Sequence, residues 1–481
     1  MKLKVLTAAL LFVWLIAPGG FPGLARASDD QALEELLEVL EKKETLSPGE
    51  AEGVKKLLQE KQAREAAPGD SAAAKDEGLT LRASLQDGLR LAAKDPKIFS
   101  LSLGGIIQTD YRYFDYKNQN PGRNEFDLRR AQVILQGQAL KYLAFRFLLE
   151  FEGANARNLL DGYMDVRLFE FLKLRAGQFK EPFGLESNTA DVQIFFAEKS
   201  MSYHLTPQRD VGAMLHGSAW EDRLNYGVGA FNGNGRDGAA SGDEDEPQLA
   251  ARLVLAPFRK LGVDFLENFQ FGGSYGHGRI DRSSVSVKVA TNGRTEFFNA
   301  SSPLKSVAVQ DAKIRDRYGL EAAWAVGPVL VMGEWIRLHY REIKTASDKF
   351  DLILDDYYLA ALVMLTGERP GLKGGLPQRI NPAHGLLEGG FGALGLAARV
   401  DVFKAGPKAY DRVINKGVSV KSARAVTGSL IWSPFSQLRL LVDFTRTEFD
   451  ARLLVHTDAL SNTAFYCDRE DALTVRLTFD F

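Results

Sequence analysis

The sequence predicts an all-β fold, a 16-stranded antiparallel transmembrane β-barrel, preceded by a short helical N-terminal segment. From Phe99 onward, apolar and polar residues alternate with a period of two, the pattern of strands with one apolar and one polar face. Short and long polar connections alternate between these strands, as in outer-membrane barrels. A single apolar run approaches membrane length, so helical spans are excluded. The net charge of −2 over 481 residues lacks the cationic excess of nucleic-acid binders.

Residues 1–27 are predicted to be a secretory signal peptide. A basic start at Lys2 and Lys4 precedes the 13 apolar residues Val5–Ala17, and Ala25-Arg26-Ala27 forms a cleavage pattern. Thirteen residues are too few to cross ~30 Å of hydrocarbon as a helix, which argues against a membrane anchor. We therefore expect cleavage before Ser28 and export of the mature chain.

Residues 28–66 are predicted to form periplasmic amphipathic helices. Leucines recur at three- and four-residue spacing from Leu33 to Leu40, and Ser47-Pro48 with Glu50 forms a helix start. Such short helices are marginal alone, so the apolar stripe is covered either by a coiled coil between subunits or by the protein's own body. Residues 67–97 are predicted to be a linker, beginning with an Ala/Pro/Gly/Ser-rich stretch.

Residues 98–481 are predicted to be the outer-membrane β-barrel. In residues 141–152, five bulky apolar residues from Leu143 to Phe151 share one face, and residues 472–481 repeat the pattern. The 384 residues from Ile98, divided among sixteen strands, leave 24 residues for each strand and its connection. The strands are predicted to begin near Ser100, Phe126, Lys141, Asp161, Leu172, Gln208, Arg223, Pro247, Leu266, Arg315, Val329, Ile353, Gly390, Val420, Gln437 and Ala472.

Residues 366–389 fit this layout poorly. The strand count requires a short turn there, yet the stretch has 24 residues with several Gly and Pro. Either a strand pair is miscounted or this turn is elongated. A soluble β-protein is the alternative for the whole fold, but no helical segment after residue 78 could cover such a sheet. The final alternating strand ends on Phe481, which resembles the C-terminal signal read by the barrel-assembly machinery.

Other chemistry has little support in the sequence. The six histidines have no metal-ligand spacing, the single cysteine, Cys467, excludes a Cys-rich site, and neither a metal nor a cofactor is predicted. His216 and Ser218 share a strand face, so a barrel-type outer-membrane enzyme stays an alternative, as does a surface adhesin without channel activity.

Four segments carry a resemblance to the phosphate-selective porins O and P. They are Phe126–Ala131 (FDLRRA), Arg175–Glu186 (RAGQFKEPFGLE), Arg209–Gly217 (RDVGAMLHG) and Gly229–Gly235 (GAFNGNG). The resemblance implies a sixteen-stranded barrel in the bacterial outer membrane, contact with its lipid, a homotrimer, and a third extracellular loop folded inward. It implies a passive diffusion channel for small hydrophilic solutes and ions, with anions such as phosphate among them, and not an enzyme.

Alternation predicts which charged side chains face the pore. For each of them, a salt bridge that stabilises the wall and selects nothing is the alternative. The predicted pore-lining residues are Arg130, Arg146, Glu150, Asp165, Arg167, Lys173, Arg175, Lys180, Arg439, Asp443 and Arg476.

Two expectations concern selectivity. Arg130 shares a face with Gln132, so it should point inward, whereas Arg129 should lie at the rim or on the lipid side unless a local bulge turns it. The presumed constriction loop, Pro182–Pro207, holds Lys199 against Glu186, Asp191 and Glu198, a net charge of −2. Because an acidic loop repels anions, the sequence favours a weakly selective pore with mixed-charge walls.

Overall fold

A computed structural model describes most of the predicted barrel. The described residues are 79–84, 88–115, 124–153, 158–233, 235, 247–279, 287–300, 309–311, 314–345, 349–407, 410, 419–457 and 464–481. The chain divides into two compact units, 1–77 and 78–481, and the described residues all belong to the second. The predicted signal peptide and the predicted helices of residues 28–66 lie outside the described residues.

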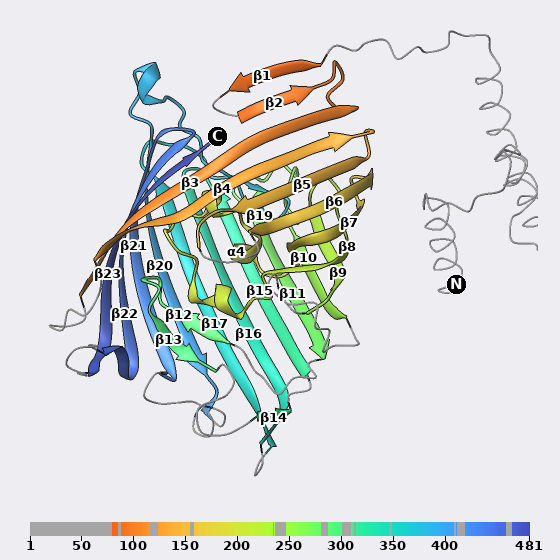
Figure 1. Ribbon diagram of the computed structural model, residues 1–481. Coiled ribbons are helices and arrows are strands. Elements are labelled where there is room, and N and C mark those ends of the chain that lie inside the picture. Colours follow the sequence, from red (N-terminus) through yellow and green to blue (C-terminus); the bar gives the residue numbers. More distant parts are fainter. Residues whose placement is uncertain are drawn as a thin grey trace, which may run out of the picture. The chain divides into compact units, whose positions relative to one another are not determined.

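Sixteen strands form a closed antiparallel barrel, each paired with the next in the chain (Figure 1). Each predicted strand corresponds to one of them, and the largest difference is at the last strand, which begins at Ala464. The sixteen are β3 (Phe99–Asp115), β4 (Glu125–Ala139), β5 (Leu143–Glu150), β6 (Leu159–Phe169), β7 (Leu172–Lys180), β8 (Arg209–Ala219), β9 (Leu224–Phe231), β10 (Gln248–Leu255), β11 (Asn268–Arg279), β15 (Ile314–Val326), β16 (Val329–Thr345), β17 (Lys349–Met364), β20 (Ala393–Ala405), β21 (Ser422–Phe435), β22 (Leu438–Thr457) and β23 (Ala464–Asp480).

The last strand closes the barrel on the first. β23 pairs with β3 from Asp471 opposite Asp115 to Asp480 opposite Ile106. Phe481 continues this ladder, because its backbone N–H and C=O each bond to Gly105 at 3.1 Å. A side chain at Gly105 would begin 2.9 Å from the Phe481 ring, so glycine leaves the room that the terminal ring occupies.

A hairpin lies in the stretch that the sequence analysis assigned to the linker. β1 (Thr80–Ser84) pairs with β2 (Gly88–Ala92), and β2 pairs with the first residues of β3, from Ser100 to Leu103 (Figure 1). This part of β3 lies before the residues that pair with β23. The sheet therefore begins before Ile98, and the predicted linker boundary is too late in the chain.

The stretch that fitted poorly is an elongated connection. β17 and β20 pair directly, with Met364 opposite Gly395, so no strand pair is missing between them. Residues 366–389, called the mouth segment below, contain β18 (Leu372–Lys373), β19 (Leu376–Pro377) and the short helix η3 (Leu386–Glu388). The segment starts and ends at the short-turn end of the barrel, which also holds the Gly327–Pro328 turn and Phe481.

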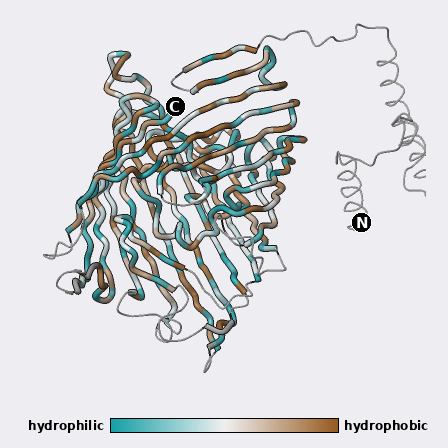
Figure 2. The backbone as a smooth tube through the Cα atoms, viewed as in Figure 1, coloured by the Kyte–Doolittle hydropathy of each residue, from teal (hydrophilic) through white to brown (hydrophobic). Residues whose placement is uncertain are grey.

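The strands have an apolar outer face, and their inner face is polar except on β15 to β22, where apolar side chains also point inward. In β23, Leu477 and Phe479 are exposed, whereas Thr474, Arg476 and Thr478, which point to the other face, are buried inside. The hydropathy of the chain changes from residue to residue along the strands (Figure 2). This is the arrangement of a barrel whose outside contacts lipid. Among the described residues, no helix is long and apolar enough to cross a membrane.

Two inward segments fill part of the interior. The inward loop, residues 181–208 between β7 and β8, contains α4 (Leu185–Asn188), η1 (Asp191–Gln193) and η2 (Met201–Leu205). The inner hairpin, residues 287–300, contains β12 (Lys288–Ala290) and β13 (Glu296–Asn299). A third short strand, β14 (Val309–Asp311), pairs with β16.

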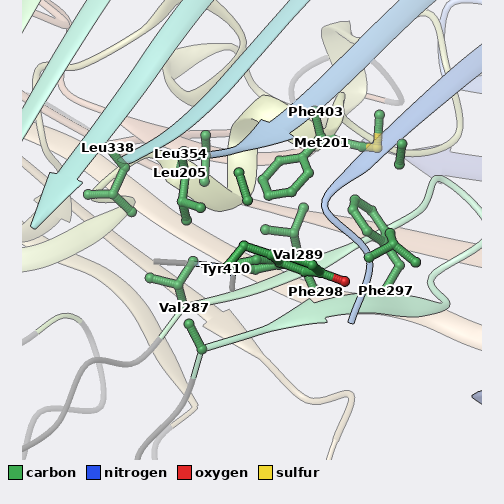
Figure 3. Close-up of a cluster of buried hydrophobic side chains, with 14 of the residues drawn as sticks. Met201, Leu205, Val287, Val289, Phe297, Phe298, Leu338, Leu354, Phe403 and Tyr410 are labelled. Atoms are coloured by element: carbon green, nitrogen blue, oxygen red, sulfur yellow. The ribbon is translucent and has the colours of Figure 1, made fainter. Parts of the chain in front are cut away.

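Both segments pack against the inner wall as a hydrophobic core. Phe297 and Phe298 of the hairpin contact Met201 and Leu205 of the loop and the inner faces of β16 to β22 (Figure 3). Phe195 and Phe196 of the loop belong to a second cluster on β15 to β22. All these phenylalanines are at most 3% exposed. The interior beside β15 to β22 is thus closed by apolar side chains.

Candidate functional site

Carboxylates of the barrel wall hold the inward loop by its backbone. Each accepts hydrogen bonds from loop N–H groups, an arrangement that fixes the path of a segment with little regular structure. Glu334 of β16 accepts from Leu185 at 2.5 Å and Glu186 at 2.9 Å, Asp401 of β20 accepts from Met201 at 2.7 Å, and Asp443 of β22 accepts from Ala197 at 2.7 Å.

Basic side chains of the wall, the inner hairpin and the loop itself neutralise the loop's acids. Glu186 pairs with Arg399 at 3.3 Å, and Asp191 pairs with Arg130 at 3.1 Å and with Lys199 at 3.3 Å. Glu198 pairs with Arg129 at 2.7 Å, with Arg476 at 2.8 Å and with Arg294 at 3.3 Å.

These ion pairs offset the formal negative charge of the inward loop. Burial opposes ionisation of Glu198, but Arg129 and Arg476 outweigh it and hold the pKa of that carboxyl well below its usual range. Asp191 behaves alike: burial opposes its ionisation, and Arg130 and Lys199 hold its pKa well below the usual range. The acids are ionised anchors with cationic partners, so the net charge of −2 does not describe the field of the loop.

Arg129 points into the barrel, and its expected place at the rim or on the lipid side is wrong. Pairing between β3 and β4 shifts from Gln108 opposite Arg130 to Thr109 opposite Leu128. Arg129 is the extra residue of this β-bulge, which turns a side chain that strict alternation would send outward. Its guanidinium binds both carboxylate oxygens of Glu198, at 2.7 and 3.1 Å. Arg130 also points inward and donates to Gln108 at 2.6 Å.

The open space lies on the other side of the interior from the apolar filling. A pocket of about 470 Å³ is bounded by β6 to β10, by Pro182 and Asn188 of the inward loop, and by the mouth segment. Its lining includes five bases and three acids, with His216 and Tyr163 beside them. The bases are Lys173, Arg175, Lys180, Arg252 and Lys373, and the acids are Asp161, Glu170 and Asp222.

Many of the predicted pore-lining residues lie on β4 to β7, and most are paired. Asp165 is buried and contacts His216 at 2.7 Å, Arg175 at 3.1 Å and Arg167 at 3.8 Å. The other pairs are Lys173 with Glu170 at 2.8 Å, Arg146 with Asp161 at 3.7 Å, Lys180 with the Thr189 carbonyl at 2.9 Å, and Glu150 with the Gln132 amide at 2.7 Å.

The remaining three predicted residues lie on β22 and β23, away from the pocket. Asp443 and Arg476 are both buried and hold the inward loop, the latter through Glu198 and the Ala197 carbonyl. Arg476 also binds Asp110 of β3 through two bonds of 2.7 Å. Arg439 is half-buried opposite Thr478. Of the predicted set, Lys173, Arg175 and Lys180 therefore line the pocket, and Arg130, Asp443 and Arg476 bind the inward loop.

Sequence reasoning missed three important charged residues. Arg399 lies on the inner face of β20 at 1% exposure, 4.4 Å from the Phe196 ring centre, and alternation within that strand could have found it. Arg294 belongs to the inner hairpin, whose three- and four-residue strands leave almost no pattern. Lys373 belongs to the mouth segment, where no periodicity predicted a position inside the barrel.

The serine and histidine of the enzyme alternative do not form a catalytic pair. His216 directs Nε2 at Asp165, and no hydrogen bond joins the imidazole to the Ser218 hydroxyl. Both residues line the pocket as parts of β8.

A closed barrel with an apolar outside, a polar and partly filled inside and an inward loop defines a channel protein of the outer membrane. Residues 101–481 match the model of the phosphate-selective porin O and P family, and the chain belongs to this family. Porin O of Pseudomonas aeruginosa is 26% identical over 325 residues, which are 61% of this chain and 70% of that protein. The crystal structure of the outer-membrane channel DcaP of Acinetobacter baumannii has the same fold, with a TM-score of 0.51 and 8% identity over 81% of this chain and 99% of that one.

Proposed function

We propose that this porin conducts small anions, phosphate among them, along the wall formed by β4 to β10. One observation carries the proposal: the lumen is filled by apolar side chains beside β15 to β22, while the space left open on the opposite wall is lined by five bases and three acids. A solute crossing the barrel would therefore meet a lining with more positive than negative charge.

The chemistry of the lining suits an anion. A phosphate that enters a narrow pore gives up part of its water, and charge-assisted N–H donors compensate best for that loss. Arg175 offers a planar donor held 4.1 Å from the Tyr163 ring centre, and Lys173 adds a neighbouring point charge. The loop acids that argued for weak selectivity are paired with arginines, so they do not repel anions as free acids would.

The assembly and orientation belong to the same proposal. We expect a homotrimer whose outer face contacts membrane lipid, with the N-terminal segment periplasmic and Phe481 recognised by the barrel-assembly machinery. The family membership supports the trimer, and the alternation of short and long connections supports the orientation.

Single-channel recording tests the proposal. The purified protein should give conductance steps in a planar bilayer, and a KCl gradient should give a reversal potential on the anion side. Lys173→Gln should move that potential toward zero, because about 8 Å of screening at physiological salt leaves only charges near the path effective. Conductance without anion preference would contradict the anion proposal, and turnover on lipid without conductance would support the enzyme alternative.

A further inference from the structure

The outer wall of the barrel carries a groove that plays no part in the channel function proposed above. It has a volume of about 800 Å³ and lies over β9, β10, β11, β15 and β16, which are neighbours in the wall (Figure 1). We propose that this groove binds an acyl chain of a bisphosphorylated glycolipid of the outer leaflet, and that basic side chains at one end of the groove bind the lipid's phosphates. The choice of leaflet rests on the orientation proposed above.

The groove faces the membrane, because exposed apolar side chains form its sides. Val228, Leu253 and Leu320 line it and are between 47% and 60% exposed. On β16 the lining residue Trp335 is followed by Ile336, which belongs to the hydrophobic core inside the barrel, so Trp335 points outward. The outside of such a barrel contacts lipid chains, and a concave apolar surface surrounds one chain more fully than a smooth wall does.

Gly273 of β11 leaves the floor of the groove open. A methyl group added at this position would have the Gly319 carbonyl at 3.5 Å and the Leu320 side chain at 3.8 Å as its nearest neighbours. These are ordinary van der Waals distances, so a side chain at Gly273 would fit the strand but would occupy the groove. Glycine weakens a strand interior, and it often marks a place where a ligand approaches the backbone closely.

Basic side chains lie at the end of the groove that is nearer the long loops. Arg337 lines the groove and binds both oxygens of Asp355, at 2.8 and 3.0 Å, and Lys404 of β20 is the register partner of Asp355. Arg341, four residues further along β16, binds Asp316. Both arginine side chains are 40% exposed, whereas Asp355 is 24% exposed and Asp316 is fully buried. The cations are therefore the outermost groups of this cluster.

These charges lie where a lipid headgroup would meet them. An arginine on the outer wall is costly at the bilayer midplane and nearly neutral close to the interface. Tyr275, Tyr318 and Tyr357 are exposed on the strands beside Arg337, and such aromatic residues mark the headgroup level of a barrel. A planar guanidinium binds phosphate through two N–H donors. A phosphate at Arg337 would therefore leave the lipid's chain directed along the groove.

The spread of the cations favours a lipid with two phosphates. Arg337 and Arg341 are four residues apart along one strand, about 13 Å, and Lys404 lies two strands from Arg337, about 10 Å. A phospholipid with one phosphate reaches only one of these cations at a time. A glycolipid with a phosphate on each sugar of a disaccharide reaches two, so it should be bound more tightly.

Retention of defined lipids tests the site. The full-length protein, purified in detergent, is mixed with bisphosphorylated lipid A, with phosphatidylglycerol or with phosphatidylcholine, and native mass spectrometry counts the lipids that stay bound. We expect lipid A to be retained at about tenfold lower concentration than phosphatidylglycerol, because it makes one more charge-assisted contact. Equal retention of these two lipids would overturn the assignment to a bisphosphorylated lipid, and retention of neither would overturn the site.

Filling the groove tests its role. Gly273→Leu should lower the retention of lipid A about tenfold or more, since the new side chain takes the space of the acyl chain. Gly428→Leu is the matched control, because Gly428 is exposed on β21 and a side chain there would meet nothing within 4 Å. Equal retention by the two variants would refute the groove. Loss of the oligomer in Gly273→Leu would identify the groove as a subunit interface and would also overturn the inference.

A second variant covers the case in which Gly273→Leu fails to fold. Arg337→Gln with Asp355→Asn removes the ion pair at the end of the groove, so lipid A should lose its advantage over phosphatidylglycerol. Arg446→Gln with Asp471→Asn is the control, because that pair has similar bonds of 2.8 and 3.1 Å on β22 and β23, away from the groove. Equal losses in both variants would refute the headgroup site. A wild type without anion preference would contradict the anion proposal, while its preference for lipid A would still support this inference.

Discussion

Arg129 and Arg130 are adjacent in the sequence and hold two different acids of the inward loop. Arg129 binds Glu198 and Arg130 binds Asp191, so one β-bulge places two cations on the same side of β4. Both side chains are at least three-quarters buried, at 25% and 12% exposure. Their main structural role is therefore to fix the loop, and any effect on ion selectivity acts through the loop's position.

Arg129→Ala should destabilise the folded protein. It removes two charge-assisted hydrogen bonds to Glu198, a loss of roughly 1.5–3 kcal/mol for a group of this kind. The temperature at which the folded species converts to the unfolded one in detergent should fall. Arg129→Lys keeps the charge but not the two-pronged geometry, so its loss should be smaller. Wild-type stability in Arg129→Ala would instead support a position of Arg129 at the rim or on the lipid side, away from Glu198.

Glu181 makes the stability depend on pH. Burial raises the pKa of this loop carboxyl from 4.5 to about 7, and the Gln248 amide donates to both its oxygens, at 2.9 and 2.7 Å. Because the folded-state pKa is the higher one, the folded form binds the proton more tightly. Protonated Glu181 therefore contributes fully to the free energy of unfolding below about pH 4.5. This contribution is lost as the pH rises through about 7.

The matched variant separates Glu181 from the other acids. Between pH 5 and pH 8 the wild type should lose stability, by up to roughly 3 kcal/mol for a shift of this size. Glu181→Gln should lose less over the same range, because its amide does not titrate. Thermal conversion in detergent at the two pH values gives the comparison, and identical pH dependence of both proteins would refute the role of Glu181.

At the scale of elements, the sequence predicts the long strands with alternating residues, but it does not predict the short strands. Sixteen strands are found because eight or more alternating residues form an unmistakable two-faced pattern. The five-residue strands β1 and β2, the four-residue β13 and the two-residue β18 carry too few positions for a period. The bulge at Arg129 depends on pairing with β3, so alternation within β4 alone offers two alternatives and cannot choose between them.

The same limit applies to the candidate site. Alternation places Arg146, Lys173 and Arg175 on the inner face, but it cannot show that the opposite wall is covered by the inward loop and the inner hairpin. That filling depends on contacts between residues far apart in the chain, such as Phe297 and Phe403, whose ring centres lie 5.3 Å apart. Which cations meet water is therefore a property of the folded interior.

The β1–β2 hairpin should be dispensable for the barrel. The hairpin joins the barrel through pairing of β2 with Ser100–Leu103 of β3, whereas closure uses β3 from Ile106 onward. Removing the hairpin therefore breaks none of the closing pairs. A chain that begins at Ile98 should refold in detergent, show heat modifiability and give conductance steps of wild-type size. If that chain fails to fold, the hairpin or the segment before it belongs to the folding unit.

At the scale of the whole molecule, closure joins the two ends of a 16-stranded sheet. Every other neighbouring pair in the barrel consists of strands that follow each other in the chain and are joined by one connection. β23 and β3, in contrast, are the last and the first strand of the barrel and are far apart in the chain. Long-range pairing of this kind is entropically the hardest to form. Phe481 adds the last two backbone bonds to this seam and places its ring over Gly105.

Deleting Phe481 should therefore impair assembly, and two variants distinguish the reason. The deletion removes both the backbone bonds and the ring, so refolding in detergent should yield less heat-modifiable species than wild type. Phe481→Ala keeps the backbone bonds to Gly105, so it should refold in detergent nearly as well as wild type. If the ring is the group that the assembly machinery recognises, the same Phe481→Ala chain should accumulate poorly in the outer membrane of cells. Normal insertion of both variants in cells would mean that the terminal aromatic residue contributes to neither closure nor recognition.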